Sequence, residues 1–425
     1  MALESIEVDT TVQPEGVRPW PARLSAASEA GSAMIDYLLP HARREFLTGS
    51  GPFGDVNRWA GAVSRVDEPA HAVLRANART SGLARRQFEQ AVEHGIESVT
   101  DPVPEVVEFF ETVDNIPPGI DLDFAQDGMI PFRRIDPING IGGLWYMFGF
   151  VFGATMPNAS RSMATGRVSV DSTKRMVESG VFAKEAMTLG GLERFGPATK
   201  SACRLRLVHA AVSISLSRKG DWDEAVYGAP ISLGDTLGAS MLGVPFVALA
   251  AQRLGYRFTD RELEAMAQLG AMFAYRMGTP VDLLPVTWAQ QRHLVYLILR
   301  TSVSGIDPES TRKVLDSLNN HESLGKTGTK LFNSFAYGYA RLILGEELCD
   351  AEGVPDSPFK RVIPMQRPLI SAWESVRVHV PGANRLTDRV ANWIWEDLFS
   401  RLFAQAEGTS SADQFNAVVD ERITA

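Results

Sequence analysis

Apolar residues recur at helical spacing along most of this sequence, and this periodicity constrains its fold more than any other feature. In the stretch 202–217 the residues spaced three or four positions apart are Leu205, Val208, His209, Val212 and Leu216. The same period recurs in segments 25–47, 70–94, 104–113, 171–187, 231–254, 260–276, 286–304, 308–318, 328–344 and 389–403. The alternation of Val, Ile and Thr that is typical of strands is scarce. We therefore predict an all-α fold.

The chain shows no clear domain division. No repeat of fixed period and no linker rich in Gly and Ser separates one part of the sequence from another. We expect a single large helical domain over residues 25–405. Residues 1–24 contain three prolines that interrupt any period, so they are expected to form an irregular arm, and residues 406–425 a polar tail.

One uncharged segment, residues 141–156, requires separate treatment. It is shorter than the roughly 20 apolar residues that cross a bilayer, it contains four glycines, and Pro157 follows it. We predict a buried helix and no stable membrane insertion. Most of its large side chains are expected to be core, with one or two free to line an apolar substrate channel: Met147, Phe148, Phe150, Phe152 and Met156.

Composition excludes several partners and compartments. A formal net charge of -9 and a pI near 5.4 argue against nucleic acid or an anionic membrane as partner. Two cysteines cannot build a disulfide framework, and the first residues lack the apolar core of a secretion signal. We expect a cytoplasmic protein. Nothing in the sequence indicates its oligomeric state.

Familiar catalytic motifs are missing. The sequence has no HExxH, no GxxxxGK[ST] and no GxSxG, and it has only one Glu-x-x-His, at residues 68–71, where a di-iron site uses two. The glycine-rich stretch 190–196 follows a predicted helix, so it is expected to be a connecting loop. His293 opens an apolar helix, which is typical of a core histidine or of a group that supports a ligand from behind.

His209 is the candidate metal ligand. Imidazole is a strong ligand for iron, and Arg204 and Arg206 on the same helix could hold the propionates of a porphyrin. The alternative is that His209 is a core or interface histidine whose ring nitrogens are satisfied by the protein.

The sequence around His209 resembles the rubber oxygenase (latex clearing protein) and MpaB-type oxygenase family over residues 175–285. The matching segments read RLRLVHAAVSISL, GDWDEAVYGAPISLGDTLGASMLGVPFVAL and RFTDRELEAMAQLGAMFAYRMGTPVDLLP. This resemblance implies helical packing around a haem, broadly as in globins, with non-covalent b-type haem as the cofactor. The family's Arg-x-x-His-Ala helix supplies the proximal haem ligand, which falls on His209, with Arg206 at the arginine position.

A second family element, Pro-Ile-Ser/Asn-x-x-Asp, matches residues 230–235. The opposite side of the haem fits less well. Polymer-cleaving relatives carry Arg-x-x-Lys-Thr on the preceding helix, whereas this chain has Arg175, Glu178 and Ser179 at those positions. The resemblance therefore implies that these three residues form the distal catalytic side. Glu178 is either an acid or base for oxygen chemistry or a solvated helix-face glutamate.

These observations predict a haem-b-dependent oxygenase for an apolar, unsaturated small molecule such as an isoprenoid, a lipid or a natural-product intermediate. The oxidant is dioxygen or peroxide, and the reaction includes oxidative C=C cleavage as one outcome. Peroxide-driven hydroxylation, a non-catalytic haem sensor or carrier, and a helical interaction protein without cofactor are the alternatives.

Overall fold

The structure, a computed structural model, describes residues 21–24, 29–46, 50–135, 157–164, 172–220, 222–301, 308–320 and 325–403, with seven single residues between 139 and 153. Regular structure in this part of the chain is helical, apart from an isolated bridge between Gly51 and Gly54. The prediction of an all-α fold is confirmed.

The helices follow one another with short connections. The first eleven are α1 (Glu29–Leu38), α2 (Ala42–Glu45), α3 (Val56–Val63), α4 (Glu68–Arg79), α5 (Leu83–His94), α6 (Pro104–Asp114), α7 (Leu122–Asp127), α8 (Met129–Arg134), α9 (Pro157–Ala164), α10 (Ser172–Ala186) and α11 (Pro197–Lys219). The rest are α12 (Glu224–Tyr227), α13 (Leu233–Gly243), α14 (Pro245–Arg253), α15 (Asp260–Arg276), α16 (Trp288–Thr301), α17 (Pro308–Asn320), α18 (Gly325–Leu344), α19 (Glu346–Ala351), α20 (Phe359–Val362), α21 (Arg367–His379) and α22 (Ala383–Phe403). Short 3₁₀ turns are η1 (Ala22–Leu24), η2 (Ile96–Ser98), η6 (Val281–Leu283) and η7 (Ile363–Gln366).

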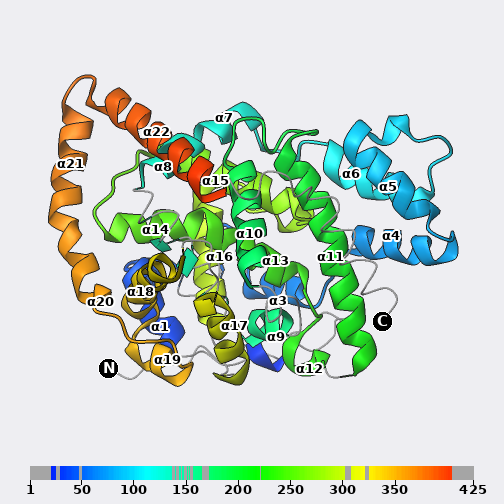
Figure 1. Ribbon diagram of the computed structural model, residues 1–425, viewed down its shortest axis with the longest axis horizontal. Coiled ribbons are helices and arrows are strands. Elements are labelled where there is room, and N and C mark those ends of the chain that lie inside the picture. The colour runs from blue at the N-terminus through cyan, green and yellow to red at the C-terminus, as the bar shows by residue number, and fades with distance from the viewer. Residues whose placement is uncertain are drawn as a thin grey trace.

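Buried apolar side chains form two clusters. The larger one joins α1, α3, α13, α14, α15, α16 and α18 in the body of the molecule. The smaller one joins α4, α5, α6 and one face of α11, and Figure 1 shows α4, α5 and α6 as a separate side module at one end. Helix α11 lies between the side module and the body, so its two faces meet different surroundings.

A tight glycine loop joins α10 to α11. A Cβ on Gly191 would lie 1.9 Å from the carbonyl oxygen of Glu185, and one on Gly196 would lie 2.2 Å from that of Gly190. Because real Cβ atoms do not approach so closely, these positions require glycine. The loop turns the chain back, and α10 packs against α11 as an antiparallel neighbour. The prediction of a connecting loop at 190–196 is confirmed.

Three predicted helices are divided in the structure. The segment 25–47 separates into α1 and α2 around Pro40, and two others break as follows. The segment 70–94 breaks where Ser81 adopts a φ of 48° and Gly82 a φ of 85°. The segment 231–254 breaks at Pro245, which lacks the backbone N–H that a continuous helix needs. In each case a local backbone constraint overrides a continuous apolar period.

The uncharged segment 141–156 is only partly described. Its large described residues, Leu144, Tyr146, Met147 and Val151, are buried in the main cluster, which confirms the core role expected of Met147. Phe148, Phe150, Phe152 and Met156 lie outside the described residues. Among the described helices, no single one is long and apolar enough to cross a membrane, whereas the bent pair α13 and α14 meets that criterion together.

Candidate functional site

His209 lies on α11, the helix between the side module and the body. Cys203, Leu207 and Ala210 on the same helix belong to the side module's core. Helical spacing turns His209 away from these three residues. Leu205 and Val212, its neighbours in the predicted stripe, pack against the side module's core, as Val208 does. His209 is half-buried.

Arg204 and Arg206 bind carboxylates of the side module. The guanidinium of Arg206 donates to both oxygens of Asp67, with Nε–Oδ2 at 2.6 Å and Nη2–Oδ1 at 2.9 Å, and also to Thr112. Arg204 donates to Glu89 and Glu93 on α5, at 2.8 Å and 2.6 Å. Both arginines are almost fully buried. They clamp the side module onto α11.

This arrangement bears on the propionate role predicted for the two arginines. Nε and Nη2 of each guanidinium are bonded to carboxylates of the chain, and Arg206 also stacks over the ring of Phe109 at 4.2 Å from its centroid. A propionate that displaced these carboxylates would break a buried ion pair, whereas Nη1 of Arg206 has no hydrogen-bond partner among the described residues. Their role in the described structure is to join helices.

The predicted distal residues lie on α10, the helix that packs beside α11. Ser179 is half-buried. Arg175 and Glu178 fall within α10, but their side chains lie outside the described residues. The structure therefore brings the helix of the three distal residues against the helix of His209.

Glu185 is a half-buried carboxyl that sequence reasoning did not single out. It lies on α10, and the hydroxyl of Ser201 on α11 donates to its Oε2 at 2.6 Å. Burial raises the pKa of Glu185, against the opposing effects of the Ser201 hydrogen bond and the charges of Arg204 and Lys184. A carboxyl with a raised pKa between these helices can carry a proton, which is typical of functional sites. In the sequence, Glu185 lies seven residues after Glu178, an interval that places two positions on the same helix face. This spacing could have identified Glu185 as a candidate.

Two other candidates prove to be structural. His293 is fully buried on α16, where the backbone N–H of Phe53 donates to its Nδ1 at 3.3 Å. Burial lowers the pKa of His293 to about 4, so the ring is a neutral core histidine. In the second family element, Ser232 and Asp235 bond each other in a capping box that begins α13.

The donor set at His209 fits a haem. Among the described residues, no three His, Cys, Asp or Glu side chains gather as they would around a protein-ligated metal ion. A haem iron takes its equatorial nitrogens from the porphyrin and needs only an axial side chain from the protein. One half-buried imidazole on this face of α11 therefore suits haem ligation better than a protein-only iron site.

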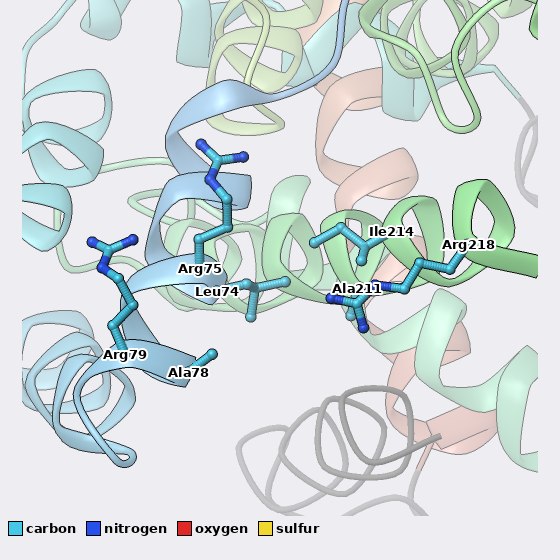
Figure 2. Close-up of a pocket in the computed structure, with 7 residues that line it drawn as sticks. All are labelled: Leu74, Arg75, Ala78, Arg79, Ala211, Ile214 and Arg218. Carbon is cyan, nitrogen blue, oxygen red and sulfur yellow. The ribbon is translucent and has the colours of Figure 1, made fainter.

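Two hollows in the described part of the molecule are not lined by His209. One, of about 570 Å³, lies beside the Arg206–Asp67 pair and residues 278–281. The other, of about 230 Å³, is a groove between α4 and α11, and Figure 2 shows Leu74 and Ile214 between three arginines. Two of these arginines are paired, Arg75 with Glu68 and Arg79 with Glu105. This groove lies on the side-module face of α11.

The described geometry is that of a helical protein with a half-buried histidine on α11, a helix that packs against α10. The sequence pattern of the family described as "ER-bound oxygenase mpaB/B'/Rubber oxygenase, catalytic domain" matches residues 141–372, more than half of the chain. The chain belongs to this family. It is therefore an oxygenase, an enzyme of the oxidoreductase class.

Two known proteins are similar to this oxygenase over most of its length. It is 25% identical over 285 residues to a rubber oxygenase from Streptomyces sp. (strain K30), covering 65% of this chain and 67% of that protein. It also resembles a solved structure of latex clearing protein LCP in the closed state, with a TM-score of 0.59 and 20% identity. That likeness covers 79% of this chain and 91% of the other, and it confirms the single-domain helical fold.

Proposed function

We propose that this oxygenase binds one b-type haem through His209 and oxidises an apolar, unsaturated small molecule. The observation that carries the proposal is the position of His209: it is half-buried, in the family's Arg-x-x-His-Ala motif, on a helix that packs against α10. The remaining histidine candidate, His293, is fully buried in the main core. His209 is thus the imidazole best placed to hold iron.

The haem would supply the redox chemistry that activates the oxidant, while the chain supplies the axial ligand and the surroundings. The buried packing of α10, α11 and α15 limits the access of water, and Phe182 of α10 packs on Phe273 of α15 with ring centroids 5.4 Å apart. A site with this apolar wall favours a substrate that carries little charge.

Proton handling falls to α10. We assign the role of general acid or base to Glu178, with Arg175 pairing it and Ser179 as a neighbouring donor. Positions seven residues apart in a helix recur on one face, so Glu178 shares its face with Glu185, which bonds Ser201 on α11. From the bond between Glu185 and Ser201 and the antiparallel packing of the two helices, we infer that position 178 lies near position 208, next to His209.

The substrate class follows from the relatives and the apolar surroundings. A protein named rubber oxygenase acts on rubber, and the analogous substrate here is a smaller unsaturated isoprenoid, lipid or natural-product intermediate. With dioxygen, cleavage of one C=C bond places one oxygen atom on each of two carbonyl products. Glu178 replaces the lysine of polymer-cleaving relatives, and this difference favours peroxide-driven hydroxylation as a second candidate.

An absorption spectrum with a pyridine haemochromogen assay tests the cofactor. We expect a Soret band and b-type haem close to one per chain in the purified protein. A folded, colourless protein that takes up no added haem would overturn the proposal.

Oxygen uptake tests the reaction. Unsaturated isoprenoids should stimulate uptake and give carbonyl products, while their saturated analogues, as matched controls, should not. Hydroxylated products formed with peroxide alone would favour the second candidate. Haem binding without turnover of any alkene would indicate that the protein is a haem sensor or carrier.

A further inference from the structure

The helices α21 and α22 present an exposed apolar stripe at the edge of the molecule. Figure 1 shows α21 standing at the side opposite the side module. Exposed apolar residues from η7 through α21 recur every three or four positions, the spacing of one helix face. They are Met365, Leu369, Trp373, Val376 and Val380, with exposed fractions from 43% to 76%.

The apolar stripe continues on α22. On α22 the residues Leu386, Val390 and Trp393 are 59%, 45% and 66% exposed. The opposite faces of both helices are held by the body: Glu374 is buried on α21, and Trp395 of α22 packs on Phe132. The exposed faces are therefore not the core faces of loosely docked helices. Contiguous apolar surface of this kind marks an interaction site.

Charge around the stripe is positive, so the net charge of -9, which argues against an anionic membrane for the chain as a whole, does not describe this surface. Residues 359–395 contain six Lys and Arg residues but only two acids, Glu374 and Asp388. Glu374 is buried against Arg377, and Asp388 is bonded to Arg134. The exposed arginines of this segment have no ion-pair partner among the described residues: Arg361, Arg367, Arg385 and Arg389.

From this combination we propose that α21 and the start of α22 dock the protein onto an anionic lipid bilayer. Interfacial helices carry Trp, Leu and Met on one face with Arg or Lys beside them, and they lie in the plane of the membrane surface. The arginines bind acidic headgroups while Leu369 and Trp373 enter the boundary with the acyl chains. This is peripheral binding and involves no spanning helix.

A second copy of the chain fits the same surface poorly. A two-fold interface brings the same patch of each copy together, so the arginines around one stripe would face the arginines around the other. No exposed carboxylate in residues 359–395 would compensate that repulsion. The acidic surface of a bilayer complements the patch, and another copy does not.

The docking surface goes beyond the proposed function, since it does not depend on haem. Co-sedimentation with phosphatidylcholine vesicles that contain or lack phosphatidylserine tests it directly. The parent protein should bind the anionic vesicles at low salt and be released by high salt, with little binding to neutral vesicles.

Variants identify the surface. Met365→Glu with Leu369→Glu should abolish vesicle binding, while Leu189→Glu with Leu331→Glu, at sites 76% and 60% exposed elsewhere, should leave it intact. Arg367→Gln with Arg385→Gln should weaken binding to anionic vesicles at least about tenfold. Circular dichroism and unchanged melting temperatures establish that each variant is folded.

Three outcomes would overturn the proposal. The parent protein does not bind anionic vesicles; or the Met365/Leu369 variant binds them as the parent does; or the parent sediments as a dimer that this variant makes monomeric, in which case a second copy covers the stripe.

Discussion

The two faces of α11 carry polar groups of similar kind and use them differently. Toward the side module, the guanidiniums of Arg204 and Arg206 are buried in bonds to Glu89, Glu93 and Asp67. Toward α10, Ser201 donates to Glu185, whose carboxyl has a pKa raised by burial, and His209 of the same helix is half-buried. Charge that is fully paired stabilises the fold. Groups left able to change their protonation or ligation are those available for chemistry.

The largest expected effect is on the paired face. Arg206→Met leaves the carboxylate of Asp67 buried without its partner, and such a loss costs about 3–5 kcal/mol in the free energy of unfolding. Urea unfolding measures it. The matched control is Arg65→Met, which breaks an exposed pair with Asp282 and should cost less than about 1 kcal/mol. Equal losses in the two variants would mean that the Arg206 pair does not clamp the side module.

A second contrast concerns His293, the buried histidine of the main core. Its pKa is lowered to about 4, so the unfolded chain binds a proton more readily than the folded protein between about pH 6.5 and about pH 4. Stability is therefore lost as the pH falls through this range, by up to about 3 kcal/mol. Urea unfolding of His293→Asn should show a shallower pH dependence than the parent. An unchanged slope would show that His293 is protonated in the folded protein.

On the other face, Glu178→Gln keeps the size of the side chain and removes its titrating group. We expect turnover to fall at least about tenfold with haem content unchanged, because proton transfer is typically worth 10²–10⁴-fold. Arg175→Ala should also impair turnover, through loss of pairing or substrate positioning. Steady-state kinetics with the true substrate measures both. Parent-like turnover of Glu178→Gln would identify a surface glutamate and make Lys174 the next residue to test.

The smallest effect is expected at Glu185. Because burial raises its pKa in the folded protein, ionising it costs stability as the pH rises through that value. Glu185→Gln cannot ionise, so its melting temperature should rise relative to that of the parent as the pH goes from acidic to neutral. Thermal melts at several pH values measure this. If the melting temperature of the variant falls relative to that of the parent toward neutral pH, the folded protein favours the ionised carboxylate.

The sequence pattern predicted which segments are helical better than it predicted which residues contact one another. The segments 260–276 and 104–113 agree with α15 and α6 to within a residue. The sequence analysis did not predict α21, whose first turn contains Pro368; proline is tolerated in the first turn of a helix. Its apolar stripe also faces outward, so no core requirement marks it.

The site was only partly predictable for a related reason. The motif around His209 is local, so it is legible in the sequence. The bond between Arg206 and Asp67 spans 139 residues, and that between Arg204 and Glu89 spans 115. Tertiary packing alone decides which face of α11 meets which helix. The two arginines therefore resembled propionate ligands until their partners were known.

The measurement that tests the account most directly is the haem content of His209→Ala. We expect this variant to lose most of its Soret absorbance while keeping the helical circular-dichroism spectrum of the parent, because the imidazole holds iron and not the fold. His94→Ala, at an exposed histidine on the side module, is the matched control and should keep its haem. Parent-like haem occupancy in His209→Ala would contradict the assignment of this face of α11 as the haem site.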